Sequence, residues 1–299
     1  MHAISGITGK VGGALARTLL ADGQRVRAVV RDERKSRYWS ALGCEVAIAE
    51  MEDPKGLTAA FTGAETAFIL PPSEFDPLPG YPEARQVIDA VAAALLRARP
   101  ARVVCLSTIG ADATQDNLLS QRTLMEATLS HLPMPVTFLR PGWFLENAAL
   151  DVASARDTGV IHSFLAPLDR SFPMVATQDV GRVAAKLLQE SSHGKRVVQL
   201  EGPRRVSPND IAAAFAKTLE KPVRAEIVPR ESWESLFRSQ GMKHPYPRMR
   251  MLDGFNEGWI DFRDDGTQAI KGTIGAQEVI ASLLRGPFPP APTDTTAGQ

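Results

Sequence analysis

The sequence of 299 residues predicts an α/β fold, in which a Rossmann-like, doubly wound parallel sheet carries a small, mostly helical C-terminal lobe. Two observations predict it. Short apolar runs alternate with segments of helical periodicity through the first half of the chain, as in right-handed β–α–β crossovers. After Pro141 this alternation loosens, and most of the late aromatic residues follow with helical spacing.

The first half should contain six strands, each a short run rich in apolar residues. These runs lie at residues 2–5, 25–30, 45–49, 66–70, 102–107 and 135–140. Helices are expected between them, at residues 10–22, 33–42, 54–61, 80–98 and 118–131. This order implies a parallel sheet that helices cover on both faces.

The second half gives fewer clear signals. We expect a helix at 143–157, a short strand at 173–176 with a helix after it, and a strand in the segment RVVQLEGP. The next helix has a good start signal, since Ser207 can cap it and Asp210 follows three residues later.

The same patterns predict how the chain divides. Residues 1–155 would form the Rossmann core, and residues 156–285 would add the remaining core elements and the lobe. Within that second part, residues 222–285 have helical spacing and are expected to form the lobe itself. Residues 286–299 are rich in proline and threonine and are predicted to be a disordered tail.

Composition excludes several classes of function. Apolar residues make up 44% of the chain, charged residues 23%, and the formal net charge is zero, so no broad field would attract nucleic acid or an anionic membrane. We expect no nucleic-acid partner, no membrane span and, without a signal-peptide pattern, a cytoplasmic location. Cys44 and Cys105 lack any metal-ligand spacing, so we expect reduced core thiols and no metal site.

A glycine-rich segment follows the first predicted strand. Gly6, Gly9 and Gly12 lie in SGITGKVGG, directly before an alanine-rich helix. Free N–H groups and the helix dipole attract phosphate there, and side chains at the glycines would block its approach. The spacing is one residue longer than the usual G-x-G-x-x-G fingerprint, but a strand before and a helix after favour a dinucleotide site over a structural turn.

The end of the second strand indicates which dinucleotide binds. An acidic residue there would hold the ribose 2′-OH of NAD(H), whereas an arginine accommodates the 2′-phosphate of NADP(H). Arg31 stands there, 19 residues after Gly12, with Lys35 close behind. A planar guanidinium suits phosphate, so NADP(H) is preferred and NAD(H) stays possible. The neighbouring Asp32 keeps open the alternative of a solvated charge cluster.

Five segments together resemble the NmrA-like branch of the atypical short-chain dehydrogenases/reductases. They are SGITGKVG, RAVVRD, AEMEDPKGL, VVCLSTIGAD and FLRPGWFLEN, and the last of these is the most specific. The resemblance extends over roughly residues 1–260. The branch includes quinone oxidoreductases and triphenylmethane reductases, and also dinucleotide-binding regulators of transcription without known catalysis.

This resemblance implies cofactor contacts along the carboxyl edge of the sheet. The glycine loop would surround the pyrophosphate, and residues at the ends of later strands would line the adenine, the ribose and the nicotinamide. The family usually has Asp-Leu at the adenine, where this chain has Glu50 and Met51. The implied cofactor-binding residues are Gly6, Thr8, Gly9, Lys10, Val11, Gly12, Arg31, Lys35, Glu50, Met51, Leu70, Pro71, Pro72, Ser107, Thr108, Pro141, Gly142, Trp143, Phe144 and Asn147.

The chain departs from catalytic short-chain dehydrogenases at one important point. Those enzymes use Tyr-x-x-x-Lys on one helix face, and the tyrosine exchanges the proton that accompanies hydride transfer. Here the residues four positions after the three tyrosines give the pairs Tyr38–Leu42, Tyr81–Arg85 and Tyr246–Arg250. The lysine that is usual in the family is replaced by Arg122. Sugar epimerase and alcohol dehydrogenase chemistry is therefore not expected.

Two candidates for catalysis remain. Arg122 is a poor proton donor at neutral pH, but it could stabilise an oxyanion on the acceptor or bind a cofactor phosphate. His162 could donate a proton to a reduced quinone, or it could be a partly buried strand or loop residue. Trp143 and Phe144 could form an aromatic wall for a flat acceptor, or they could belong to the core.

Two functions stay open at this point. In the first, the chain is an NADPH-dependent reductase of a small quinone-like or other electron-poor acceptor, whose reduction needs positioning more than a strong general acid. In the second, the dinucleotide is a signal that orders the loops around 71–80 and 160–172 for a regulatory protein partner. In either case we expect a monomer or a homodimer.

Overall fold

The computed structural model describes residues 1–286, so the predicted tail after Gly286 lies outside the described residues. Up to residue 141 the elements are β1 (His2–Ile4), α1 (Lys10–Ala21), β2 (Val26–Val30), α2 (Glu33–Ala41), β3 (Glu45–Ile48), α3 (Pro54–Phe61), β4 (Thr66–Ile69), α4 (Pro82–Ala98), β5 (Arg102–Leu106), α5 (Ser120–Leu129) and β6 (Val136–Pro141). All six predicted strands and five predicted helices form, and their ends lie within two residues of the predicted positions.

The second half contains β7 (Trp143–Phe144), a 3₁₀ helix (Leu145–Asp151), α6 (Val152–Asp157), β8 (Val160–Ser163), β9 (Met174–Val175), α7 (Thr177–Gln189), β10 (Lys195–Glu201), α8 (Pro208–Leu219), β11 (Arg224–Ile227), a 3₁₀ turn (Arg230–Ser232), α9 (Trp233–Ser239), α10 (Tyr246–Glu257), β12 (Gln268–Lys271) and α11 (Ala276–Arg285). The predicted start of α8 is confirmed. The Ser207 hydroxyl accepts the N–H of Asp210, and the Asp210 carboxylate accepts the N–H of Ser207.

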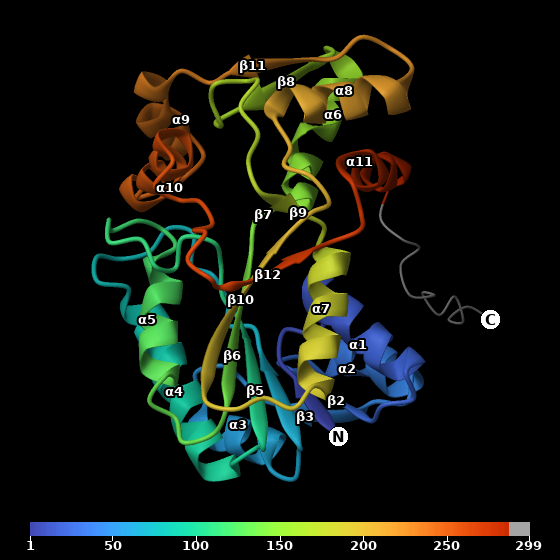
Figure 1. The fold of residues 1–299 in the computed structure, drawn as a ribbon, viewed down its shortest axis with the longest axis vertical. Coiled ribbons are helices and arrows are strands. Elements are labelled where there is room, and N and C mark those ends of the chain that lie inside the picture. Colours follow the sequence, from blue (N-terminus) through green and yellow to red (C-terminus); the bar gives the residue numbers. More distant parts are fainter. Residues whose placement is uncertain (287–299) are drawn as a thin grey trace, which may run out of the picture.

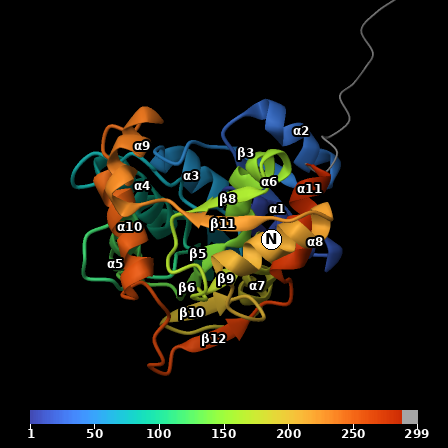
Figure 2. The same ribbon diagram turned by 90° about the horizontal axis from the view of Figure 1, so that it is seen from above.

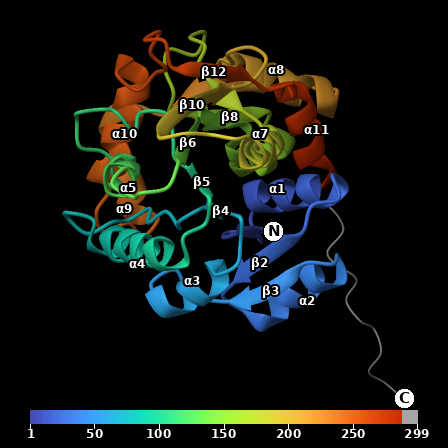
Figure 3. The same cartoon turned by 60° about the horizontal axis from the view of Figure 1, so that its bottom comes forward.

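Eight strands form one sheet in the order β12-β10-β6-β5-β4-β1-β2-β3, and every neighbouring pair is parallel. Figure 3 looks along this sheet and shows α1 and α7 on one side, with α3, α4 and α5 on the other. The predicted α/β fold with a doubly wound parallel sheet is therefore confirmed. The chain leaves β1 toward β2 on one side and returns to β4 on the other, so a topological switch point lies between β1 and β4.

One local prediction was wrong. Residues 143–157 do not form one helix, because the chain first makes β7, which pairs with β9. Gly142 permits this path, since a Cβ atom there would overlap the carbonyl of Pro173. The mostly helical region 222–285 also contains two strands that were not predicted. β11 pairs with β8, and β12 extends the main sheet beside β10, which no local periodicity in so short a segment could indicate.

The lobe stands over the carboxyl edge of the sheet. Figure 1 shows β8, β11 and α8 above the end of β6, from which β7 continues. Viewed from above in Figure 2, α9 and α10 lie on one side of β8 and β11, and α8 and α11 lie on the other. The C-terminal region is thus mostly helical, as expected, while the boundary at residue 155 stays a prediction.

Three apolar clusters hold these layers together. One lies between the sheet and α3, α4 and α5, a second lies between the sheet and α1, α2 and α7, and a third fills the lobe around Phe215 and Phe237. Cys44 and Cys105 are buried free thiols, as predicted, and burial raises the pKa of both. No helix within residues 1–286 is long and apolar enough to cross a membrane.

Candidate functional site

The carboxyl ends of β1, β4, β5 and β6 lie side by side because these strands are neighbours in the sheet. The segments that follow them are the glycine loop, residues 70–81, residues 107–119 and the turn at 141–147. Open α/β sheets bind their ligands at this edge, next to the switch point. The structure therefore brings the predicted loop residues to one edge of the sheet, below the lobe.

The glycine loop is a tight turn between β1 and α1. Gly6 has a φ of +64°, a conformation that side chains disfavour, and its carbonyl accepts the N–H of Gly9 at 3.0 Å. A Cβ atom at Gly12 would overlap the Gly6 carbonyl, whereas one at Gly9 would lie 3.3 Å from the same oxygen. Gly12 therefore allows α1 to pack against the loop, and Gly9 keeps the outer surface of the loop free of a side chain.

The first turn of α1 is open to an anion. Gly9 provides no side-chain cap, no acidic residue lies in the first turn, and Thr8, Gly9 and Lys10 are exposed. In contrast, Asp32 and Asp53 cap α2 and α3 with their carboxylates. The unbonded N–H groups and the positive end of the helix dipole at α1 suit a phosphate.

The end of β2 carries exposed cations. Arg31 and Lys35 are exposed and form no ion pair within residues 1–286. The carboxylate of Asp32 is bonded instead to the backbone N–H of Arg34 at 2.8 Å and to its guanidinium at 3.0 Å, which lowers the pKa of Asp32. The acidic neighbour thus leaves Arg31 available for an anion.

The residues expected around the adenine and the ribose differ in exposure. Glu50 is exposed after β3, whereas Met51 is buried in the core. After β4, Leu70 is half-buried and packs closely on Gly6, and its N–H is bonded to the Ser5 hydroxyl at 2.9 Å. Leu70 thereby connects the loop after β4 to the glycine loop.

Arg122 holds the segment after β4. Its guanidinium donates to the carbonyl of Pro71 at 3.1 Å and to the hydroxyl of Ser73 at 2.6 Å, and it approaches the carbonyl of Pro72. The neighbouring Gln121 exchanges two hydrogen bonds with the backbone of Glu74. These contacts describe a residue that positions this loop, while the oxyanion role expected for Arg122 stays a prediction.

A buried ionic cluster at the end of β5 was missed in the sequence. Ser107 donates its hydroxyl to Glu126, and Arg140 binds the same carboxylate with two nitrogens, at 2.9 and 2.6 Å. The side chains of Arg140 and Glu126 are only 12% and 11% exposed. The ion pair joins β6 to α5, and its carboxylate accepts the hydrogen bond from the Ser107 hydroxyl. The only signal in the sequence was a charged residue inside each of two apolar segments.

The turn after β6 passes between two strands. The N–H of Gly142 is bonded to Leu200, and the N–H of Trp143 to Pro173, at 2.8 and 2.9 Å. The half-buried Trp143 ring meets Phe255 of α10 edge-on, with centroids 5.3 Å apart.

The rest of this turn is fixed by one carboxylate. Glu146 accepts the N–H and the hydroxyl of Thr177, at 2.9 and 2.6 Å, and so caps α7. Phe144 packs toward the sheet core, whereas Asn147 is exposed. Trp143 is therefore the aromatic side chain of the turn that contacts the lobe.

His162 lies apart from these residues. It stands in β8 with an exposed side chain, opposite Glu226 of β11, in the two-stranded sheet at the top of Figure 1. The structure does not bring it to the carboxyl edge of the main sheet, and its acid role stays a prediction. Thr108 is half-buried at the end of β5.

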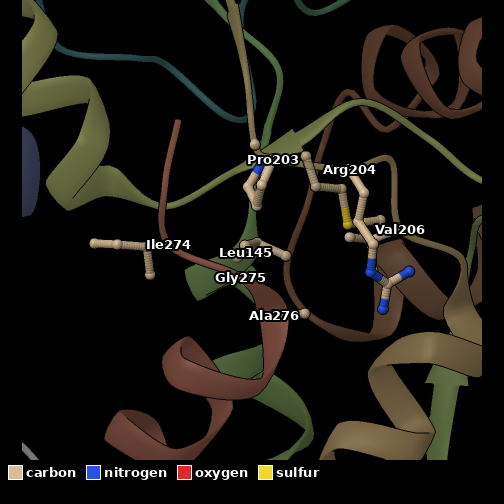
Figure 4. Close-up of a pocket in the computed structure, with 9 residues that line it drawn as sticks. Leu145, Pro203, Arg204, Val206, Ile274, Gly275 and Ala276 are labelled. Carbon is tan, nitrogen blue, oxygen red and sulfur yellow. The ribbon is translucent and has the colours of Figure 1, made fainter. Parts of the chain in front are cut away.

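Two cavities lie near the lobe. One of about 320 Å³ opens between residues 77–81 and the segment 243–249. The other, of about 240 Å³, lies behind the turn and is shown in Figure 4, where Leu145, Val206 and Ile274 line it and Arg204 lies at its side. Arg204 pairs with Asp210 at 3.2 Å.

No three His, Cys, Asp or Glu side chains within residues 1–286 are grouped to hold a metal ion.

Together, the sheet, its switch point and the glycine loop with its uncapped helix N-terminus define a Rossmann-like α/β protein. The chain belongs to the NmrA-like family, whose model matches residues 3–258, and the resemblance seen in the sequence is confirmed.

Its relatives include enzymes. The NAD(P)H azoreductase of Xenophilus azovorans is 26% identical over 260 residues, which cover 86% of this chain and 85% of that protein. Quinone oxidoreductase 2 of Escherichia coli (strain K12) is 26% identical over 244 residues, 81% of this chain and 82% of that protein. The crystal structure of the NADPH-dependent quinone oxidoreductase QOR2 from Escherichia coli, complexed with NADPH, shares the fold with a TM-score of 0.78 and 23% identity, covering 95% of this chain and 99% of that one.

Proposed function

We propose that this chain is an NADPH-dependent reductase of quinone-like or other electron-poor acceptors. The observation that carries the proposal is an uncapped helix N-terminus with exposed cations beside it and an aromatic side chain at the same sheet edge. The α1 terminus is uncapped, and Arg31 and Lys35 are exposed without carboxylate partners in the described chain. The relatives named as an azoreductase and a quinone oxidoreductase support the reaction class.

The residues present fit an NADP(H) cofactor. The N–H groups of Lys10, Val11 and Gly12 would hold the pyrophosphate, and Arg31 with Lys35 would hold the 2′-phosphate. When bound, the cofactor supplies a hydride, which is two electrons and one proton. A quinone that accepts it needs one further proton to become a hydroquinone, and water can provide this proton.

The chain's own residues would position the reactants. Arg122 and Gln121 fix the segment after β4, while Glu126 and Arg140 fix the ends of β5 and β6. Trp143 presents a half-buried ring beside the lobe, which suits a flat acceptor. Holding the two reactants in place contributes most to the rate of a reaction that requires no strong acid.

The test is an NADPH absorbance assay with the full chain and a panel of quinones and dyes. We expect loss of NADPH that depends on the acceptor and yields equal amounts of NADP⁺ and reduced acceptor. The matched control is Gly9→Asp, which should place a negative side chain in the pyrophosphate site and abolish turnover. Tight NADPH binding without oxidation by any acceptor would contradict the reductase and favour a dinucleotide sensor.

A further inference from the structure

A cavity of about 320 Å³ lies beyond the carboxyl edge of the sheet, where three segments of the chain meet. Residues 77–81 end the segment that follows β4, and Asp116 belongs to the segment that follows β5. The lobe contributes residues 243–247 and Met249. The cavity therefore adjoins both of the segments whose first residues are expected to line the cofactor.

The cavity also adjoins the position of the missing catalytic tyrosine. Leu118 lies four residues before Arg122, so it stands where a Tyr-x-x-x-Lys pair would carry its tyrosine. The N–H of Leu118 donates to the carbonyl of Pro247, and the Tyr81 hydroxyl donates to the carbonyl of Asn117, both at 2.9 Å. Tyr81 and Pro247 both line the cavity. Because that tyrosine would exchange a proton with the substrate, a molecule in the cavity would lie next to the place of reaction.

Hydrogen bonds fix the walls of the cavity to one another. The Asp76 carboxylate accepts the N–H groups of Lys243 and His244, at 2.8 and 2.6 Å. On the other side, the Tyr81 hydroxyl lies 2.8 Å from the carboxylate of Asp116. The segment after β4 is thus tied both to the lobe and to the segment after β5. Since the walls are fixed in this way, a ligand would bind with little loss of chain freedom.

The walls suit a flat ring. The buried ring of Tyr81 and four prolines, two from each side, line the cavity. Proline rings are rigid and apolar, and an aromatic ring packs well against them and against the face of a phenol. Ligand sites usually have volumes of about 300–1,000 Å³, so this cavity admits a compact molecule rather than a large dye. The prolines are Pro77, Pro79, Pro245 and Pro247.

The charges around the cavity cancel. Its lining contains two acidic residues, Asp116 and Glu234, and two basic residues, Arg238 and Lys243. Arg238 pairs with Glu234 at 2.9 Å, and Asp116 already accepts the Tyr81 hydroxyl. A charged ligand would lose hydration and meet as many like charges as opposite ones. The lining therefore favours an uncharged ligand.

We propose that this cavity binds the acceptor, and that the acceptor is a small, flat, uncharged molecule of one or two rings. The inference rests on the proposed reductase function and narrows its substrate class. Trp143 is not part of the lining, so the ring contacts come from Tyr81 and the prolines instead. Burial and the Asp116 carboxylate raise the pKa of Tyr81, so its hydroxyl stays protonated and the proton for the reduced acceptor comes from water.

Covalent blocking of the cavity tests this assignment. Leu78 lines the cavity and is 47% exposed, so Leu78→Cys should fold and present a thiol that N-phenylmaleimide modifies. The native thiols of Cys44 and Cys105 are buried and should not react. Leu96→Cys is the matched control, because Leu96 is also 47% exposed but lies near the far end of α4.

Modification of Leu78→Cys should raise the KM for 1,4-naphthoquinone at least about tenfold, because the added ring occupies the space of the acceptor. The Kd for NADPH should stay unchanged. Modification of Leu96→Cys should change neither value. In the wild type, the KM for the neutral quinone should be lower than the KM for its 2-sulfonate, and the reverse order would refute the uncharged class.

Protection from modification measures binding without turnover. 2-Naphthol cannot be reduced by NADPH, and it should slow the modification of Leu78→Cys but not that of Leu96→Cys. If no quinone is reduced but this selective protection is seen, the reductase fails and the ring-binding cavity stands. If no quinone is reduced and neither thiol is protected, both proposals are refuted.

The opposite failure is also distinguishable. If quinones are reduced and modification of Leu78→Cys raises KM no more than modification of Leu96→Cys, the cavity is refuted as the acceptor site and the reductase stands. Should Leu78→Cys fail to fold, Tyr246→Cys replaces it under the same criteria, since Tyr246 lines the same cavity and is 64% exposed.

Discussion

The two halves of the sheet's carboxyl edge are built in different ways. Beside β1 and β2, backbone groups and exposed cations are left without partners, and the geometry is set within one short segment of chain. Beside β5 and β6, charged groups are buried and paired across distant segments, as Glu126 and Arg140 are. The first half is therefore set by the local sequence and open to a ligand, whereas the second half is held by contacts between distant segments.

The largest effect is expected where the buried ion pair is broken. Arg140→Met leaves the Glu126 carboxylate buried without its cation, so the free energy of unfolding should fall by about 3–5 kcal/mol. Urea unfolding at neutral pH measures it. Arg25→Met is the control beside β2, because the Arg25–Glu45 pair is exposed. This substitution should lower the free energy of unfolding by about 1 kcal/mol or less. If both variants lost the same free energy of unfolding, the two halves would not differ in the way described.

In the glycine loop, one glycine should matter for stability and another for cofactor binding. Gly12→Ala places a methyl group against the Gly6 carbonyl, so it should destabilise the protein by about 2–3 kcal/mol. Gly9 has an extended φ of −86°, and aspartate is a good N-cap, so Gly9→Asp should keep the stability and weaken NADPH binding at least about tenfold.

Urea unfolding and cofactor titration of both variants check this pair. A Gly9→Asp variant that folds and binds NADPH as tightly as the wild type would show that the loop does not hold the pyrophosphate.

A further effect, which depends on pH, concerns a carboxyl group of the lobe. Burial raises the pKa of Asp151 to about 6, whereas Arg34 lowers the pKa of Asp32. A carboxyl whose pKa is raised by folding stabilises the fold below its unfolded value and loses this contribution as the pH rises through about 6.

Asp151→Asn should therefore be more stable than the wild type by about 3 kcal/mol at pH 7.5, and the gain should vanish near pH 4. Urea unfolding across this range measures the difference. A constant difference at all pH values would mean that Asp151 does not titrate there.

The parts of the structure that were predictable are those decided by nearby residues. Strand–helix alternation placed every element up to residue 141, and the Ser207–Asp210 capping box placed the start of α8. β7 and β12 were missed because strands of two and four residues depend on the neighbours they pair with. No local pattern could distinguish them from loop or helix.

The same distinction applies to the site. The glycine loop and Arg31 could be found because their spacing follows one β–α–β unit. The Glu126–Arg140 pair joins elements that only the fold brings close together. Local signals thus located the glycine loop and Arg31, whereas the contacts between distant segments required the structure.

The most direct test of the account is a titration of the full chain and of Arg31→Ala with NADPH and with NADH. The wild type should bind NADPH more tightly than NADH. Arg31→Ala should weaken the binding of NADPH by about tenfold to a hundredfold and leave the binding of NADH nearly unchanged. Equal losses for both dinucleotides, or a wild type that binds neither, would contradict a 2′-phosphate site at the end of β2.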